Sequence, residues 1–314
     1  MSLDANVKAM LDQMKAMALP KMWELGPQAA RAAMRLRFPG ITETPTGPIT
    51  DRTIPGPAHA IGVRIYTPLS ATSTVLPGLI FFHGGGFVLG DLDSHDDLCR
   101  VLANESGCRV VSIDYRLAPE HPFPAAVDDC FAATKYVAAH AGEFGIDASR
   151  LAVGGDSAGG NLAAVVCQLA KGGGPKIAYQ LLIYPVTQLG APVDTPSMRE
   201  NGKGYFLEKE GMDWFTKLYC PDHAHRTDPR LSPLLCQDLA GQPPAYVITA
   251  GFDPLRDEGK DYADALDKAG VSVTYVNYPG MVHGFFSMRA LIPKAREAVA
   301  AAAAALREGL ARTA

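Results

Sequence analysis

The sequence lacks the features that mark several classes of protein. Its 314 residues include 29 Lys and Arg against 33 Asp and Glu, a formal net charge of −4, and no basic run stands out. The missing positive patch argues against nucleic acid as a partner. No segment approaches the roughly 18 consecutive apolar residues of a membrane span, and the first residues lack the basic-then-apolar order of a signal peptide. We therefore expect a protein that binds neither nucleic acid nor a membrane.

Cysteine is also scarce. The six Cys residues form no C-x-x-C pair and show no spacing to His that would favour a metal site. Disulfide frameworks are typical of small secreted chains, and this chain is neither small nor marked for secretion. We expect reduced, mostly buried thiols in a cytoplasmic protein without a structural metal. The six are Cys99, Cys108, Cys130, Cys167, Cys220 and Cys236.

Hydrophobic residues make up 47% of the chain and charged residues 20%, which is typical of a globular protein with a sizeable core. From about residue 60, short apolar runs alternate with stretches of helical period. The stretches at 123–140, 161–170 and 255–269 have the length of helices, and 293–314 is rich in helix formers. This alternation predicts an α/β fold with a mostly parallel sheet and right-handed crossovers. The predicted strands lie at 61–66, 79–82, 109–113, 151–153, 178–184, 245–249 and 271–276.

Two segments do not fit this alternation. Residues 4–18 place Val7, Met10 and Met14 at helical spacing, and the charges between them cancel. This pattern predicts a helix packed on the rest of the protein, and a membrane-surface helix, which is usually basic, is the alternative. Residues 187–235 contain five prolines and an aromatic stretch at 205–219 but no strand pattern. An insertion of this length between strands is usually a lid or a binding element.

The pattern G-x-S-x-G at 155–159 is the strongest indication of chemistry. It directly follows a predicted strand and precedes a predicted helix, the context in which a nucleophilic serine stands at the apex of a sharp turn. Small residues two positions to either side let the flanking backbones approach each other. The pattern predicts Ser157 as a nucleophile, and an ordinary glycine-rich turn is the alternative.

A second glycine-rich loop follows another predicted strand, where His83 precedes three consecutive glycines. Backbone N–H groups that no side chain obstructs can stabilise the oxyanion of a tetrahedral intermediate. A phosphate-binding loop is the alternative, but G-x-x-x-x-G-K-[ST] is absent and the G-x-G-x-x-G register fails. Both loops fall at the carboxyl ends of strands, where α/β sheets bind their ligands.

An activated serine requires a base and an acid that orients this base. Among the eight histidines, His283 stands apart because it lies in a glycine-flanked loop between the last predicted strand and the closing helix. Asp253 follows the preceding strand by a few residues, whereas Asp257 falls in the first turn of a helix and is assigned to structure. The order Ser157, Asp253, His283 is that of the α/β-hydrolases. His83 is expected to hold the shape of the glycine loop.

Together these motifs resemble those of the hormone-sensitive-lipase-like family, the bacterial carboxylesterases within the α/β-hydrolase fold. The matching segments are 83–86, 114–120, 155–161, 253–259 and 283–285, in the order and at the spacing of that family. The resemblance implies a mostly parallel central sheet flanked by helices, with a helical cap. It divides the chain into a catalytic domain of residues 46–186 and 231–314 and a cap made of residues 1–45 and 187–230.

The resemblance also implies a site. The backbone amides of Gly85, Gly86 and Ala158 are expected to form the oxyanion hole, with Gly84 in the same loop. A triad of Ser157, Asp253 and His283 would then hydrolyse a small-molecule ester through an acyl-enzyme, with no cofactor and no metal. We expect the substrate to contact Phe87, Tyr184, Leu207, Met212 and Phe285.

The sequence also predicts the size of the substrate. Bulky apolar residues of the cap could roof the serine and limit the acyl group to short or medium length, because each buried methylene is favourable only until the pocket is full. Packing of the cap onto the core, without any limit on length, is the alternative. The roof residues are Met22, Trp23, Tyr205, Phe206, Leu207, Met212, Trp214 and Phe215.

Three other functions share some of these features. An amidase or deacetylase would use the same triad on a different leaving group. A ligand-binding protein on a hydrolase scaffold should have lost a member of the triad, and all three are present here. Nothing in the sequence favours an interaction protein that works through the cap. The resemblance further suggests a homodimer, paired through an edge strand near 271–276.

Overall fold

The computed structural model describes residues 2–36, 44–189 and 194–311. One eight-stranded sheet runs through it in the order β1-β2-β4-β3-β5-β6-β7-β8. β1 and β2 pair antiparallel with each other, β2 pairs antiparallel with β4, and all other neighbours are parallel. The strands are β1 (Ile49–Pro55), β2 (Ala60–Tyr66), β3 (Leu76–Phe82), β4 (Arg109–Asp114), β5 (Ile146–Asp156), β6 (Tyr179–Ile183), β7 (Ala245–Phe252) and β8 (Val273–Val282).

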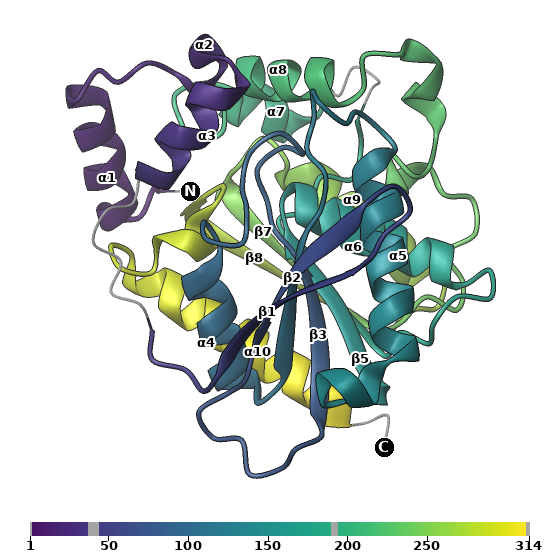
Figure 1. The fold of residues 1–314 in the computed structure, drawn as a ribbon. Helices are drawn as coiled ribbons and strands as arrows, with labels where there is room; N and C mark the ends of the chain where they lie inside the picture. Colours follow the sequence, from purple (N-terminus) through teal and green to yellow (C-terminus); the bar gives the residue numbers. More distant parts are fainter. Residues whose placement is uncertain (1, 37–43, 190–193, 312–314) are drawn as a thin grey trace.

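Helices cover both faces of this sheet (Figure 1). Successive residues of β3 point to opposite faces, so Ile80 and Phe82 join one buried cluster while Leu79 and Phe81 join the other. The first cluster is covered by α5 (Ala125–Ala139), α6 (Ala158–Ala170) and α9 (Arg256–Lys268), and the second by α4 (Asp96–Ser106) and α10 (Pro293–Ala311). The expected α/β-hydrolase architecture is therefore confirmed.

Every predicted strand and helix of the sheet layers is present, with shifted ends. The main differences are that β5 runs from Ile146 to Asp156 rather than over 151–153 and that β8 starts at Val273 rather than 271 and continues to Val282. In addition, α6 starts directly after Ser157. β8 lies at one edge of the sheet, where a predicted dimer contact would fall. Residues 312–314 of the expected closing helix lie outside the described residues.

Two elements of the sheet layers were not predicted, β1 and α4. β1 has Ile54 as its one buried residue and therefore shows no apolar run in the sequence. α4 buries Leu98, Val101 and Leu102, whose helical spacing was available in the sequence as a signal.

The N-terminal residues form three helices, α1 (Ala5–Ala16), α2 (Met22–Leu25) and α3 (Pro27–Leu36). α1 buries Val7 and Met10, and the Asp4 N–H donates to the Gly280 carbonyl at the end of β8 at 3.0 Å. The predicted packing of this segment on the protein is thus confirmed. No helix in the described ranges is both long and apolar enough to cross a membrane.

The insertion after β6 contributes α7 (Pro196–Asn201), α8 (Lys209–Tyr219) and a short turn of helix, His223–Thr227. α2 and α8 lie side by side at the end of the molecule where the parallel strands finish (Figure 1). Lys21 pairs with Glu208 at 3.0 Å, and the Trp23 ring lies against Gly211 of α8. Residues 37–43 and 190–193, parts of the two predicted cap segments, lie outside the described residues.

The remaining short helices are Ala141–Phe144, Pro233–Leu235 and Phe285–Met288. The six cysteines are free thiols. Five are buried and Cys236 is partly exposed, so the expectation of mostly buried thiols is confirmed.

The junction of α6 with β3 yields a prediction about stability. A Cβ on Gly159 would lie 1.8 Å from the Phe82 carbonyl oxygen, a backbone atom that cannot move independently. Gly159→Ala should therefore lower the free energy of unfolding by about 3 kcal/mol or more, measured by denaturant titration.

Gly172, beyond the other end of α6, provides the matched control. A Cβ there meets nothing closer than 3.6 Å, so Gly172→Ala should change stability by about 0.5 kcal/mol or less. Equal stability of Gly159→Ala and the wild type would show that α6 does not depend on this close approach.

Candidate active site

Ser157 occupies the sharp turn between β5 and α6. Its backbone has φ 56° and ψ −116°, a conformation that costs an L-residue steric energy and is found mainly where function requires it. The Ser157 N–H donates to the Ile183 carbonyl at 2.9 Å, and its own carbonyl accepts from Asn161 N–H at 3.1 Å. These bonds hold the turn against β6 and direct the serine toward the carboxyl edge of the sheet.

The structure brings the two predicted partners to this serine. His283 directly follows β8, and its Nε2 lies 2.9 Å from Ser157 Oγ. Its Nδ1 lies 2.7 Å from Asp253 Oδ2, just after β7. Because a carboxylate only accepts hydrogen bonds, Nδ1 carries the proton and Nε2 is free to accept the serine hydroxyl.

The acid is itself held in place. Asp253 is fully buried, and its second oxygen, Oδ1, accepts from the Leu255 N–H at 2.8 Å. Asp257 instead accepts from the Ser197 N–H at 2.7 Å and pairs with Arg256. Asp257 therefore takes part in a contact between α7 and α9.

The glycine loop after β3 supplies unpaired backbone donors. The Gly84 N–H already donates to Asp156 Oδ1 at 2.9 Å. Among the described residues, the N–H groups of Gly85, Gly86 and Ala158 have no hydrogen-bond partner. Gly86 has φ 63°, and a Cβ there would lie 2.3 Å from the Phe215 ring, so only glycine fits.

His83 lies inside this loop. Burial, together with the nearby His95, lowers the pKa of His83 to about 4, so its imidazole is neutral. Its Nδ1 lies 2.9 Å from the Gly84 carbonyl, and the Tyr115 hydroxyl donates to the His83 carbonyl at 2.7 Å. These contacts agree with its expected role in holding the shape of the loop.

A buried pair beside the serine was missed by sequence reasoning. Asp156 lies 3.2 Å from His95 Nε2 and accepts from Gly84. Burial alone would raise the pKa of Asp156, but the His95 imidazole, the Gly84 N–H and His83 together hold it below its usual value. The Asp156 carboxylate thus ties the glycine loop to the turn that carries Ser157. Its position within G-x-S-x-G was an available signal, whereas His95 carried none.

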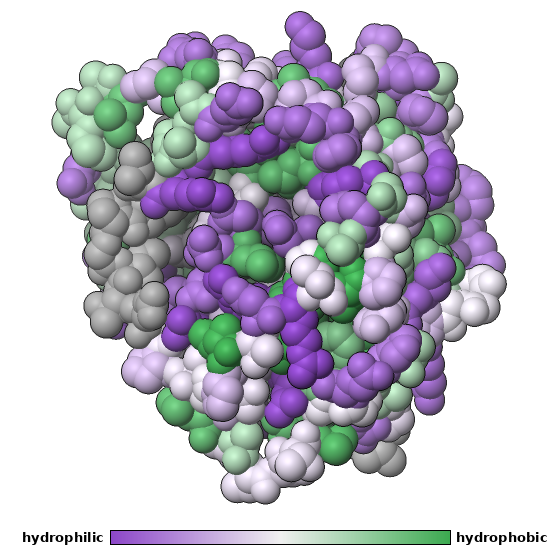
Figure 2. All heavy atoms as spheres, in the orientation of Figure 1, coloured by the Kyte–Doolittle hydropathy of each residue, from purple (hydrophilic) through white to green (hydrophobic). Residues whose placement is uncertain are grey.

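A pocket of about 210 Å³ opens beside Ser157 and His283. Phe87, Leu207 and Met212 line it, as expected, and so do all the predicted roof residues. In Figure 2, hydrophobic atoms lie recessed behind a mostly hydrophilic rim on this face of the molecule. The pocket is smaller than the roughly 300–1,000 Å³ typical of sites for drug-sized ligands.

Two residues expected at the substrate do not line this pocket. Tyr184 is 1% exposed, and its ring packs against the His283 imidazole at 4.7 Å between centroids. Phe285 is fully buried against Tyr184 and Phe286. Because both rings lie in the core beneath the histidine, the expectation that they contact the substrate is corrected.

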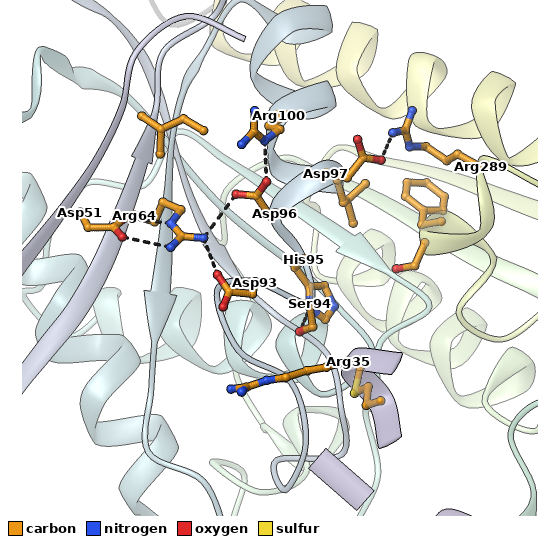
Figure 3. A pocket seen from close by; sticks show the side chains of 15 residues that line it. Arg35, Asp51, Arg64, Asp93, Ser94, His95, Asp96, Asp97, Arg100 and Arg289 are labelled. Carbon is orange, nitrogen blue, oxygen red and sulfur yellow. Dashed lines mark hydrogen bonds and ion pairs between the residues drawn. The ribbon is translucent and has the colours of Figure 1, made fainter. Parts of the chain in front are cut away.

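A second, more polar cavity adjoins the first and shares Met34, His95 and Ser287 with it. Its charges are paired: Arg64 contacts Asp51, Asp93 and Asp96, and Arg289 contacts Asp97 (Figure 3). In the described part of the chain, no group of three or more His, Cys, Asp or Glu side chains could hold a metal ion.

Comparison with known proteins identifies the class. Residues 79–287 match the family model of the α/β-hydrolase fold. The carboxylic ester hydrolase LipN of Mycobacterium tuberculosis is 49% identical over 272 residues, 83% of this chain and 70% of the relative. The esterase LipI of the same organism is 43% identical over 281 residues, 88% of this chain and 87% of the relative.

Solved structures agree with these relatives. An ester hydrolase from the metagenome of Lake Arreo, solved with a bipyridine phosphonate derivative, has a TM-score of 0.94 and 45% identity, covering 98% of this chain and 99% of its own. A hyperthermophilic esterase from Pyrobaculum calidifontis has a TM-score of 0.93 and 40% identity, with both chains fully covered. The chain therefore belongs to the hormone-sensitive-lipase-like carboxylesterases of the α/β-hydrolase fold, and it is a carboxylic ester hydrolase.

Near the acid, Glu258 of α9 joins this helix to the start of the insertion. Its Oε1 accepts from the N–H groups of Thr187 at 2.7 Å and Gln188 at 3.2 Å, and its Oε2 is buried without a partner among the described residues. Burial raises the pKa of Glu258 to about 8, and the negative charge of Asp253 contributes. The carboxyl group is therefore protonated in the folded protein at neutral pH.

This raised pKa predicts a pH-dependent effect of Glu258→Gln. The unfolded carboxyl loses its proton above its ordinary pKa of 4.5, while the folded one keeps it up to about 8. The wild type therefore loses stability as the pH rises through this window, and the glutamine variant does not. The difference in free energy of unfolding, measured in urea at pH 5 to 8, should grow with pH in favour of Glu258→Gln.

The gain should reach several kcal/mol at most. Glu308 is exposed on α10, and Glu308→Gln is the control. Its free energy of unfolding should change with pH as that of the wild type does. Parallel curves for Glu258→Gln and the wild type would contradict a neutral buried carboxyl group.

Proposed function

We propose that the protein hydrolyses esters of short- and medium-chain acids through Ser157, His283 and Asp253, by way of an acyl-enzyme. The observation that carries this proposal is the chain of two hydrogen bonds, 2.9 Å from Ser157 to His283 and 2.7 Å from His283 to Asp253. These two hydrogen bonds lie beside free backbone donors in a small apolar pocket. Nucleophile, base, orienting acid and oxyanion donors are the parts that acyl transfer needs.

Acylation comes first in this mechanism. As Ser157 Oγ bonds to the ester carbonyl carbon, His283 Nε2 takes the serine proton and the carbonyl π electrons move onto oxygen. The backbone N–H groups of Gly85, Gly86 and Ala158 stabilise this oxyanion, and the loss of one such donor typically costs about 3–4 kcal/mol. Asp253 keeps the imidazole in the reactive tautomer and stabilises the imidazolium.

Acylation ends when the tetrahedral intermediate collapses, the bond to the alcohol oxygen breaks, and His283 gives that oxygen its proton. Deacylation repeats these steps with water. Water then attacks the acyl-enzyme while His283 takes its proton, and the acid leaves as Ser157 recovers the hydrogen. Every proton moves through one nitrogen, Nε2, so this sequence requires no cofactor.

We further propose that residues 1–45 and 187–230 act together as a cap over the serine. Residues of both segments line the pocket, among them Trp23 of α2 and Met212 of α8. The roof they form is apolar, so it should favour acyl chains up to the length that fills the pocket.

An amidase or deacetylase would use the same residues, and the leaving group distinguishes the two activities. Hydrolysis of p-nitrophenyl butyrate should exceed that of the matched p-nitroanilide by orders of magnitude. A faster anilide reaction would favour the amidase instead.

The triad yields a mutational prediction. Ser157→Ala and His283→Ala should each lower kcat by roughly 10⁴- to 10⁶-fold, and the double variant should be little worse, because the triad acts as a unit. Asp253→Asn should fold normally and lose roughly 10⁴-fold through the wrong histidine tautomer. Steady-state rates with p-nitrophenyl butyrate test all of these variants.

Asp257→Asn is the matched control for the acid. It removes the same charge four residues further on and should keep most of the activity. A nearly active Asp253→Asn together with a dead Asp257→Asn would reverse the assignment.

The pocket yields a prediction on chain length. Along a series of p-nitrophenyl esters from acetyl to palmitoyl, kcat/KM should peak between butyryl and hexanoyl and fall steeply beyond, where the chain must displace packed side chains. Met212→Ala should move the optimum to longer chains. Lys217→Ala, exposed on the same helix, should leave the optimum unchanged. A wild-type rate still rising at palmitoyl, with activation at an oil–water interface, would refute the roofed pocket.

A further inference from the structure

We propose that Arg31, in helix α3, is a positioning residue for the oxyanion hole. The inference is that its guanidinium fixes the glycine loop through backbone carbonyls, so that the Gly85 and Gly86 N–H groups face the reacting carbonyl. It rests on the proposed function, and it assigns to an N-terminal helix a part in the chemical step.

The contacts of Arg31 reach two segments far away in the sequence. Its Nε donates to the Val88 carbonyl at 2.8 Å, and one terminal nitrogen donates to the Ala118 carbonyl at 2.8 Å. Both terminal nitrogens also bind the Glu120 carboxylate, at 2.9 and 2.7 Å. The Arg31 side chain is 25% exposed and its bonds to the two carbonyls are partly buried, whereas Glu120 is 45% exposed.

Val88 belongs to the same tight turn as the oxyanion donors. The N–H groups of Val88 and Leu89 donate to the Gly85 carbonyl at 3.2 and 2.8 Å. The orientation of the Gly85 carbonyl therefore depends on the orientation of the peptide that carries the Val88 carbonyl. That carbonyl accepts a hydrogen bond from Arg31.

The second segment strengthens this coupling. The Ala118 N–H donates to the Phe87 carbonyl at 2.9 Å, and the Ala118 carbonyl accepts from Arg31. Arg31 thus bridges two loops that also bind each other. Without it, two partly buried carbonyls would lose a charged donor, which favours rearrangement of the turn.

The opposite side of the turn is held by the insertion. The Phe87 ring stacks on Tyr219 at 3.9 Å between centroids with an interplanar angle of 4°, and the Phe215 ring covers Gly86. These rings restrict the turn from the side of α8, whereas Arg31 supplies polar bonds from α3. A planar guanidinium with five donors can serve both carbonyls and the carboxylate, and a lysine ammonium with three donors cannot reproduce this fork.

Arg35 offers a natural comparison on the same helix. It pairs with Asp91 at 2.7 Å, and its side chain is 62% exposed. It binds a side chain rather than a backbone carbonyl, and exposed ion pairs contribute little. Arg35→Met therefore matches Arg31→Met in chemistry and helix but should not disturb the glycine turn.

The experiment compares Arg31→Met, Arg31→Lys, Arg35→Met and Glu120→Gln. For each we would measure kcat and KM with p-nitrophenyl butyrate and the inhibition constant of an alkyl trifluoromethyl ketone, whose adduct with Ser157 carries an oxyanion. Arg31→Met should lower kcat about 10- to 100-fold with KM changed less than threefold, since small misplacements of catalytic groups have effects of this size. The inhibition constant should rise by a similar factor.

The other variants isolate the cause. Arg31→Lys should stay within about threefold of Arg31→Met, because the positive charge alone does not restore the carbonyl bonds. Glu120→Gln should stay within about threefold of the wild type, since those bonds remain, and Arg35→Met should match the wild type. Thermal melting would verify folding, and Arg31→Lys supplies the test if Arg31→Met does not fold.

Two results would overturn the inference: a folded Arg31 variant with kcat within threefold of the wild type, or a lower kcat with an unchanged inhibition constant. Ser157→Ala separates this failure from failure of the proposed function. If Ser157→Ala is inactive and the Arg31 variant is normal, only the role of Arg31 is wrong. If Ser157→Ala retains activity, the proposed mechanism itself fails.

Discussion

Ser157 adopts a backbone conformation with a positive φ of 56°, which a side chain tolerates only when the surrounding structure imposes it. Here the imposing contact is the approach of α6 to β3, where Gly159 lies against the Phe82 carbonyl with no room for a Cβ. This contact ties the end of β3, and thus the start of the glycine loop, to the turn that carries Ser157. The geometry of the whole site depends on it.

The parallel strands bring the remaining groups to the same edge. Asp253 follows β7 and His283 follows β8, so two adjacent strands bring these side chains within hydrogen-bonding distance of each other, and His283 within that distance of Ser157. Asp156 links the Ser157 turn to Gly84, and the rings of Tyr219 and Phe215 pack on the glycine loop from α8. The site is thus held by backbone contacts and buried side chains rather than by mobile surface groups.

Much of this arrangement could be predicted from the sequence, because the family motifs and the alternation of strands and helices are local patterns. What escaped prediction depends on tertiary contacts. β1 has a single buried residue and no apolar run. His95 becomes a partner of Asp156 only once α4 packs beside the sheet. Tyr184 was expected at the substrate, but the end of β6 turns its ring under His283. Local patterns carry no information on such contacts between distant segments.

The proposed mechanism requires a covalent acyl-enzyme on Ser157. The most direct measurement is mass spectrometry of the protein quenched in acid during turnover of p-nitrophenyl butyrate, followed by proteolysis and peptide mapping. We expect a butyryl adduct that is confined to the peptide containing Ser157 and is absent from the Ser157→Ala variant. An adduct on another residue, or undiminished turnover by Ser157→Ala without any adduct, would contradict it.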